Sequence, residues 1–104
     1  MEKEYSQLTI DILSAIRRVP SGKVASYGAV AAAAGHPRGA RMVVRVLHSL
    51  SKKEGLPWYR IVNVKGEIVL SGSGEMEQIL LLKKEGVRFV SENRVEKSYF
   101  YDFK

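Results

Sequence analysis

Hydrophobic residues near the start of the chain recur every three or four positions. The residues that follow this spacing are Tyr5, Leu8, Ile12, Leu13, Ile16 and Val19. The spacing places their side chains on one face of a helix, so we expect an amphipathic helix from about Tyr5 to Arg18 that packs into the core. The segment Pro20-Ser21-Gly22 contains two helix-breaking residues and is expected to end it.

A second, shorter helix is predicted from about Tyr27 to Ala34. Ser26 is a suitable N-cap, because its hydroxyl can accept a hydrogen bond from the first turn, and Gly35 suits the position just after the helix. The run from Ala31 to Ala34 makes this helix thin. A thin helix lets a neighbour approach closely, as the first helix of a helix-turn-helix must.

A third helix is predicted from about Arg38 to Leu50, after the turn at Gly35-His36-Pro37. Its apolar face comprises Met42, Val43, Val46, Leu47 and Leu50. The opposite face, here called the basic stripe, comprises Arg38, Arg41, Arg45, His48 and Lys52. The basic stripe contains no acid and so forgoes the ion pairs that usually stabilise a solvated helix face. This pattern favours a phosphate-bearing partner.

The second half of the chain alternates short β-branched runs with one further helix. We expect residues 51–55 to be a linker, residues 60–63 and 67–70 to form a β-hairpin, and residues 75–85 to form a helix ended by Gly86. The residues expected to face inward from that helix are Met76, Ile79, Leu80, Leu82 and Leu81. Residues 87–90 are a candidate strand, and the aromatic tail at 99–103 is expected to fold back onto the body.

These elements predict a mainly α fold with a small β wing. We interpret it as a winged helix-turn-helix with a three-helix core and one C-terminal helix. A chain of 104 residues, 45% of them hydrophobic, is long enough for one core but not for two separate domains. The sequence therefore predicts a single DNA-binding domain that spans residues 1–104.

The net charge of +6 is concentrated in one part of the chain. Between His36 and Arg60 there are six Lys and Arg residues against one acid, Glu54. A local basic patch of this kind is typical of proteins that bind a polyanion, although a solvated basic surface is the alternative.

Several classes of protein are excluded by what the sequence lacks. Without cysteine there can be no disulfide, thiolate nucleophile or cysteine-bound zinc, and two histidines alone do not make a metal site. We expect no cofactor and no metal. No run of 18 apolar residues and no secretory leader is present, so we expect a soluble cytoplasmic protein that does not enter membranes and is associated with the nucleoid when bound to DNA.

The segment Gly55-Leu56-Pro57-Trp58-Tyr59-Arg60-Ile61-Val62 combines two aromatic rings with a guanidinium next to a rigid turn residue. Pro57 restricts both its own backbone and that of Leu56, so Trp58 and Tyr59 are expected at a bend. Such a set can stack on a nucleobase and donate hydrogen bonds to its edge. A single tryptophan is also the common anchor of a small core, and the octapeptide by itself favours that interpretation.

The arrangement of elements and motifs resembles the C-terminal domain of O6-alkylguanine-DNA alkyltransferases, and more closely the alkyltransferase-like proteins. The resemblance covers nearly the whole chain. Its most specific parts are residues 22–27, the pair Ala40-Arg41, residues 57–62 and residues 85–87. Alkyltransferases have Cys-His-Arg after the proline, and their cysteine accepts the alkyl group. Trp58 stands where that cysteine would be, as it does in alkyltransferase-like proteins, which bind alkylated guanine without repairing it.

The resemblance implies roles for individual residues. Arg41 resembles the arginine finger that fills the gap left by a flipped base, and Tyr27 resembles the tyrosine that presses on the phosphate of the target nucleotide. Trp58 would line the base pocket, with Tyr59 beside it and Arg60 anchoring the motif. The other residues with a role implied by the resemblance are Ser71 and Ser73, at the lip of the pocket, and Glu85, which matches the family glutamate. Arg38 and Arg45 are expected to bind DNA as members of the basic stripe.

The sequence departs from the alkyltransferase pattern at three places. Tyr59 replaces the usual histidine, so no imidazole is available to Glu85 for a proton relay. Val44 stands where the family has glycine, which with Arg45 adds bulk near the DNA. An asparagine hinge expected before the motif is missing, with only Ser49 and Ser51 nearby.

We therefore predict a monomeric, non-enzymatic sensor that flips O6-alkylguanine out of double-stranded DNA. The resemblance implies that it flags the lesion for the damage-recognition proteins of nucleotide excision repair. The alternative is a winged-helix transcription regulator that reads undamaged DNA and leaves Trp58 buried. A third hypothesis, an enzyme such as a glycosylase, has only Glu85 and Asp102 as weak candidates for a base.

Overall fold

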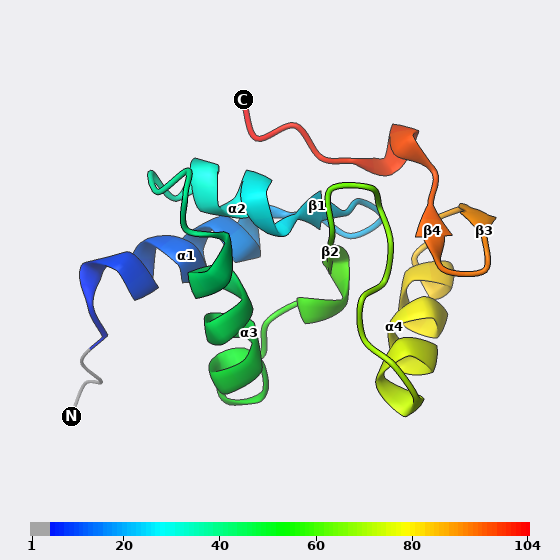
Figure 1. Cartoon of the computed structure of the whole chain (residues 1–104), viewed down its shortest axis with the longest axis horizontal. Coiled ribbons are helices and arrows are strands. Elements are labelled where there is room, and N and C mark those ends of the chain that lie inside the picture. Colours follow the sequence, from blue (N-terminus) through cyan, green and yellow to red (C-terminus); the bar gives the residue numbers. More distant parts are fainter. Residues whose placement is uncertain (1–4) are drawn as a thin grey trace.

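The computed structural model describes residues 5–104, which form four α-helices, two small two-stranded sheets and two 3-10 turns (Figure 1). In chain order the elements are α1 (Gln7–Arg18), β1 (Ala25–Ser26), α2 (Tyr27–Ala33), α3 (Ala40–Glu54), the 3-10 turn η1 (Trp58–Arg60), β2 (Ile61–Val62), α4 (Ser73–Lys84), β3 (Phe89–Ser91), β4 (Arg94–Val95) and the 3-10 turn η2 (Lys97–Tyr99). This content confirms the predicted fold class. No helix within residues 5–104 has both the length and the apolar character needed to cross a membrane.

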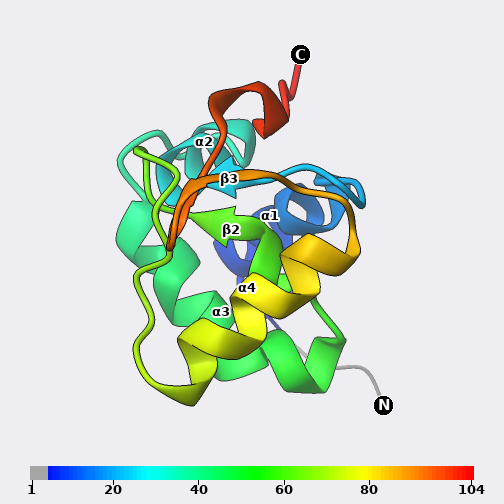
Figure 2. The same cartoon turned by 90° about the vertical axis from the view of Figure 1, so that its right-hand side faces the viewer.

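Helices α1, α2 and α3 enclose the larger of two hydrophobic clusters (Figures 1 and 2). α1 begins two residues later than predicted, because the Ser6 hydroxyl caps it by accepting from the Thr9 N–H at 3.2 Å. The predicted cap of α2 is confirmed, since Ser26 Oγ accepts from the Ala29 N–H at 3.0 Å. Gly35 follows α2 with a φ of 87°, in the left-handed region that glycine tolerates. Ala31 is fully buried, and its small side chain allows the close packing expected of a thin helix.

The predicted bounds of the third helix are wrong at both ends. α3 begins at Ala40 with Gly39 as its N-cap, so Arg38 lies in the preceding turn and not on the helix. It also continues through residues 51–54, which were expected to be a linker, and ends where Gly55 adopts a φ of 62°. Nothing between Leu50 and Gly55 breaks a helix, so propagation continues until the first glycine.

The β-hairpin predicted for residues 60–70 is also wrong. Ile61–Val62 instead pairs in parallel with Ala25–Ser26, which joins the motif segment to the start of α2. Asn63 closes a tight loop by accepting the Lys65 and Glu67 N–H groups on its Oδ1, at 3.0 and 2.8 Å. The second arm then turns away, and the Ile68 N–H donates to the Asn93 carbonyl.

Helix α4 packs over the second, smaller cluster, but with a different face from the one predicted. Leu82 is buried and Ile79 packs against the cluster, as expected. Met76 and Leu80 are 66% and 62% exposed, which contradicts the prediction that they face inward. Gln78 takes the inward position instead, 3% exposed. Gly86, with a φ of 89°, follows the end of α4 as predicted.

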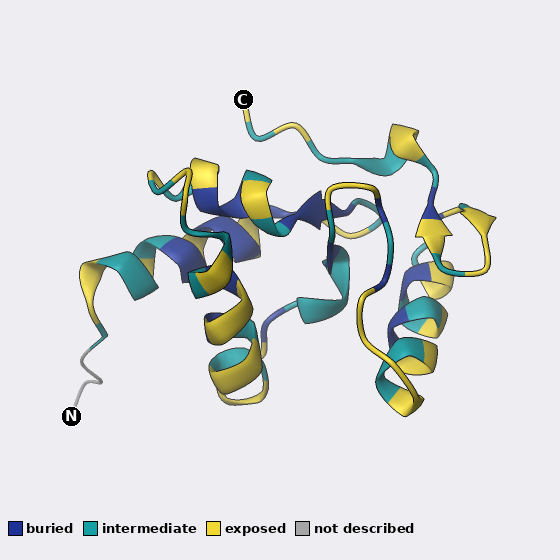
Figure 3. Ribbon diagram, in the orientation of Figure 1, coloured by how far each residue is buried: buried dark blue, intermediate teal, exposed yellow. Residues whose placement is uncertain are grey.

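The C-terminal segment returns along the body, as its aromatic residues predicted. The expected strand lies at Phe89–Ser91, slightly later than predicted, and pairs with Arg94–Val95. Tyr99 and Phe100 pack against the second cluster, while Tyr101 and Phe103 pack against the first. Figure 3 shows the resulting distribution, with buried residues along β1 and the inner faces of the helices, and exposed residues on the outer side of α3.

Candidate nucleic-acid interface

The segment that carries the tryptophan is a sharp bend between α3 and β2. Leu56 is 4% exposed and holds the segment in the first core. The Arg60 N–H donates to the Pro57 carbonyl at 3.1 Å, which closes the turn predicted at this proline. The buried strand β2 follows directly and fixes the other end.

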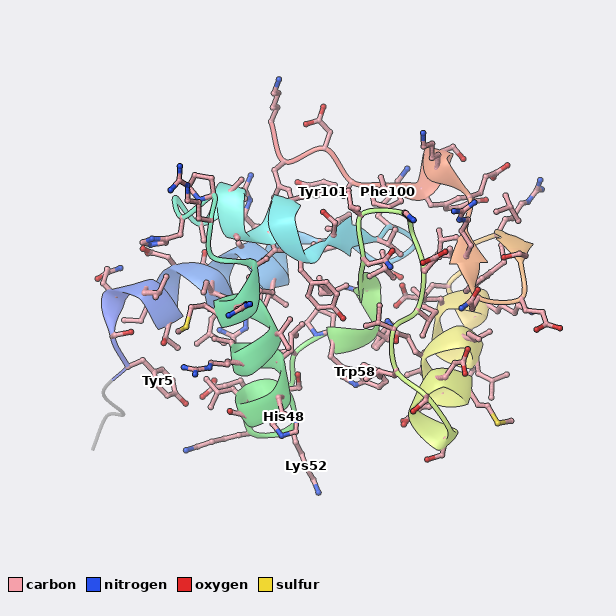
Figure 4. The ribbon with its side chains drawn as sticks, in the orientation of Figure 1. Tyr5, His48, Lys52, Trp58, Phe100 and Tyr101 are labelled. Atoms are coloured by element: carbon pink, nitrogen blue, oxygen red, sulfur yellow. The ribbon has the colours of Figure 1, made fainter. Side chains whose placement is uncertain are left out.

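Trp58 lines an open cleft of about 1160 Å³, here called the Trp58 cleft. Its side chain is neither fully buried nor fully exposed, and its ring stands at 88° to that of Tyr59 with 5.8 Å between the centroids. Figure 4 shows Trp58 between α3 and α4. The Trp58 ring is therefore accessible from the cleft, which a tryptophan enclosed in the core would not be, while Tyr59 packs against the second cluster with the Arg60 guanidinium over its ring at 5.4 Å.

Behind the aromatic pair lies a set of hydrogen bonds centred on Glu85, here called the Glu85 network. Arg60 donates from Nη2 to Glu85 Oε2 at 2.7 Å and from Nε to Oε1 at 3.1 Å. Glu85 also accepts from the Tyr59 hydroxyl at 3.0 Å and from the Gly22 N–H at 2.9 Å. A further bond from Arg60 Nη1 to the Val19 carbonyl, at 2.9 Å, ties the motif to the end of α1.

The Glu85 network favours the charged forms of Glu85 and Arg60 and the protonated form of Tyr59. Burial by itself would raise the pKa of Glu85, but hydrogen bonds from Arg60, the Gly22 N–H and Tyr59 together lower it. The hydrogen bonds to Glu85 raise the pKa of Arg60, and burial together with the bond to Glu85 raises the pKa of Tyr59. Glu85 is thus a carboxylate with its oxygens occupied by donors, and Tyr59 supplies a donor but no imidazole.

Gln78 is a part of the site that the sequence reasoning missed. Its side-chain nitrogen donates to the carbonyls of Tyr59 and Ile61, at 3.0 and 3.1 Å, so α4 holds both ends of the motif segment. Both partners are acceptors, which fixes the orientation of the amide. The available signal was a single uncharged polar residue between Glu77 and the apolar run that starts at Ile79, although that pattern alone does not say what the amide binds.

The basic stripe is exposed along its length, but it divides into two parts. Arg38, Arg41 and Arg45 are exposed and do not line the Trp58 cleft. His48 and Lys52, farther along α3, do line it. Within the part of the chain that the structure describes, no acid forms an ion pair with any member of the stripe. The stripe is therefore a surface of uncompensated positive charge.

Of the remaining predicted site residues, one lines the Trp58 cleft and two do not. Tyr27 begins α2 and lines the cleft, where burial raises the pKa of its hydroxyl. Ser71 and Ser73 are exposed and do not line the cleft, whereas the neighbouring Leu70 does. The loop thus presents an apolar side chain to the cleft where we expected a hydroxyl.

Two further residues singled out from the sequence are Val44 and Asp102. Val44, expected to add bulk near DNA, is half-exposed and lines the α3 wall of the cleft. Asp102, the weak candidate for a general base, is exposed on the C-terminal tail and does not line the cleft.

Sequence comparison identifies a protein family and several relatives of this chain. Residues 7–87 match the family described as the DNA-binding domain of 6-O-methylguanine DNA methyltransferase. The DNA base-flipping protein of Escherichia coli (strain K12) is 41% identical over 98 residues, which cover 92% of this chain and 74% of that protein. Alkyltransferase-like protein 1 of Schizosaccharomyces pombe is 35% identical over 78 residues, covering 73% of this chain and 72% of that protein.

Solved structures agree with the sequence relationship. S. pombe Atl1, in complex with damaged DNA containing O6-carboxymethylguanine, matches with a TM-score of 0.79 and 27% identity, over 96% of this chain and 99% of that one. The O6-methylguanine methyltransferase of Mycobacterium tuberculosis shares the fold, with a TM-score of 0.64 at 23% identity, over 81% of this chain and 51% of that one. The chain therefore belongs to the family of the 6-O-methylguanine DNA methyltransferase DNA-binding domain, among its alkyltransferase-like members.

Proposed function

We propose that this protein is a non-enzymatic sensor of DNA damage, which flips O6-alkylguanine out of duplex DNA and holds it in the Trp58 cleft. The observation that carries the proposal is the position of Trp58, partly exposed on a cleft whose α3 wall continues into the basic stripe. The names of the relatives support it, since they include a DNA base-flipping protein and a structure bound to damaged DNA. The chain contains no cysteine that could accept an alkyl group.

The energetics of such a mechanism are favourable. Extruding a base costs a few kcal/mol, and the cost is lowest where the base is already mispaired or damaged. Stacking a base on an aromatic side chain contributes about 1–3 kcal/mol, and phosphate contacts from Arg38 and Arg45 supply further binding free energy. Arg41 would fill the gap in the stack, Tyr27 would press on the flanking phosphate, and the duplex would kink around the helix.

The test compares two duplexes that differ only by one O6-methylguanine, with Trp58 fluorescence as the signal. Stacking on a purine changes the surroundings of the indole, so we expect tighter binding and a larger change in emission with the damaged duplex. A transcription regulator that reads intact DNA would give the same affinity and the same spectral response with both. Equal responses would therefore exclude the lesion sensor in favour of that alternative.

Mass spectrometry tests separately whether an alkyl group is transferred from the DNA to the protein. After incubation with alkylated DNA, the mass of the protein should be unchanged, because an indole carbon is a poor acceptor for an alkyl group. A stoichiometric gain equal to the mass of the alkyl group less the one hydrogen that it replaces would overturn the non-enzymatic part of the proposal.

The biological consequence we propose is that the bound monomer marks the lesion for nucleotide excision repair. A protein that holds a lesion without reversing it acts only if another system removes the damage. Co-purification of damage-recognition proteins with the complex on damaged DNA, but not on intact DNA, would support this step.

A further inference from the structure

The last two residues of the basic stripe have different surroundings from the other three. Arg38, Arg41 and Arg45 lie outside the Trp58 cleft, but His48 and Lys52 line it together with Trp58. Figure 4 shows both on the C-terminal half of α3. A role in holding the DNA backbone therefore fits the first three residues better than these two.

The positive charge of Lys52 has no ion-pair partner among the described residues, and the His48 ring adds an N–H donor beside it; the acid that lines the same cleft is Glu77, from α4. The other two cations that line it are paired, Arg60 with Glu85 at 2.7 Å and Arg17 with Glu54 at 3.2 Å. Among residues 5–104, neither His48 nor Lys52 has an ion pair or a side-chain hydrogen bond in the structure. The α3 wall is thus a site with donors available to a ligand.

Ser51 adds a third polar group to the same wall. It lies one helical turn after His48 and next to Lys52, and it also lines the cleft. Its Oγ is the buried side-chain polar atom of the described residues that makes no hydrogen bond. Buried hydroxyl groups are nearly always hydrogen-bonded, and because protein covers this one, the Ser51 side chain would have to rotate toward the cleft to donate to a ligand.

The cleft has room for more than a flipped base. Its volume of about 1160 Å³ exceeds the range of roughly 300–1,000 Å³ for pockets that hold drug-sized ligands. The α3 wall changes in character along its length, from apolar at Val44 and Leu47 to polar at His48, Ser51 and Lys52. A substituent that extends from a base stacked on Trp58 toward the polar part would meet donors and positive charge.

We propose that His48, Ser51 and Lys52 form a subsite for an anionic group on the O6 substituent, so that the protein prefers carboxyalkyl adducts of guanine over neutral adducts of the same size. This inference rests on the proposed function, because it assumes that the damaged base enters the Trp58 cleft. Lys52 supplies a charge-assisted hydrogen bond to the carboxylate, and the His48 ring supplies an N–H donor in either protonation state. A DNA phosphate has the same acceptor chemistry and is the other possible source of the anion.

Three duplexes of one sequence distinguish the two sources. They carry guanine, O6-carbamoylmethylguanine or O6-carboxymethylguanine at a single position. The two adducts have the same shape and differ in charge, and all three duplexes have the same phosphates. We expect the wild-type protein to bind the carboxymethyl duplex about three- to fivefold more tightly than the carbamoylmethyl duplex, as one partly solvated ion pair allows.

Two variants then assign the preference to the subsite. Lys52→Gln should bring the ratio between the two adducts close to one, and His48→Leu should lower it by a smaller factor. Both side chains are exposed, so neither change is expected to unfold the protein. Arg45→Gln is the matched control, because Arg45 lies on the same stripe but outside the cleft, and it should weaken all three duplexes equally.

Each other outcome has a definite meaning. If both adducts bind equally well and better than guanine, the anionic subsite is wrong and the proposed function stands. The subsite is also wrong if Lys52→Gln weakens all three duplexes in parallel, since that result assigns Lys52 to a phosphate. If neither adduct binds better than guanine, the proposed function itself fails.

Discussion

Both the Glu85 network and the basic stripe contain positively charged side chains near the Trp58 cleft. Only in the network does such a side chain form an ion pair with an acid, Arg60 with Glu85. Arg60 and Glu85 have side chains that are 16% and 13% exposed, and their hydrogen bonds join α1, η1 and the end of α4. The arginines of the stripe are exposed and have no acidic partner in the described structure. We therefore expect the network to stabilise the fold and the stripe to be available to a ligand.

The largest expected effect comes from removing the acid of the network. Glu85→Ala would leave the partly buried Arg60 guanidinium without its counter-ion, so we expect the free energy of unfolding to fall by about 3 kcal/mol. Urea denaturation measures this loss directly. The control is Glu67→Ala, which removes a well-exposed pair with Arg94, 3.7 Å long, and one hydrogen bond that Glu67 accepts from the Asn63 amide at 3.1 Å. That change should cost less than about 1 kcal/mol, and similar losses in the two variants would contradict the distinction between network and surface.

The same network predicts how stability depends on pH. The pKa of Glu85 is lowered from its ordinary value of 4.5, so its contribution is fully present above that value and is lost as the pH falls through the lowered pKa. The pKa of Tyr59 is raised from 10.0, so its contribution is present below pH 10.0 and is lost as the pH rises through the raised value. Between these limits the network should contribute nothing to the pH dependence.

The predicted loss of stability at low pH can be tested by urea denaturation at a series of pH values between about 3 and 7. The wild-type protein is compared with the Glu85→Gln variant. We expect the variant to lose less stability on acidification than the wild type does, because its amide does not titrate. Parallel curves would mean that other carboxyl groups account for the acid sensitivity.

The contrast between the two regions also explains which parts of the molecule the sequence could predict. The caps at Ser26 and Gly35 and the end of α4 at Gly86 follow from local backbone preferences, and they were predicted correctly. The position of Trp58 at a bend after Pro57 follows from the same kind of argument. Whether that indole faces solvent or the core does not follow from local preference, and the residues alone favoured the wrong answer.

The errors arose where distant segments decide the outcome. Ile61 and Val62 have a high strand propensity, but nothing local shows that their partner is Ala25–Ser26 and not residues 67–70. Gln78 faces inward because its amide donates hydrogen bonds to the carbonyls of Tyr59 and Ile61. The helical periodicity of the sequence gives no sign of these two acceptors. The Glu85 network joins residues separated by up to 63 positions, so its geometry could be suspected only through the family resemblance.

A smaller effect, on DNA binding, is expected when Arg41 is replaced. It tests whether the basic stripe contributes to base flipping as well as to phosphate binding. If Arg41 fills the space left by a flipped base, it stabilises only the complex with damaged DNA. Arg41→Ala should then lower the ratio of damaged to intact affinity about fivefold, which corresponds to about 1 kcal/mol. The matched control is Arg45→Ala, one turn along the same exposed face, and titrations of both variants with both duplexes give the two ratios. A parallel loss of affinity in the two variants would show that Arg41 is one more phosphate contact.

The smallest effect is expected for Arg45, which should matter for DNA and hardly at all for the fold. Its side chain is exposed and has no acidic partner, so Arg45→Ala should change the free energy of unfolding by no more than about 0.5 kcal/mol. Each phosphate contact releases counter-ions from DNA, so losing one should reduce the slope of log K against log salt by about 0.9. Titrations of an intact duplex at several salt concentrations, with urea denaturation of the same preparation, measure both quantities. A clear loss of stability would mean that the stripe supports the fold, as the Glu85 network does, and an unchanged slope would place Arg45 away from the DNA backbone.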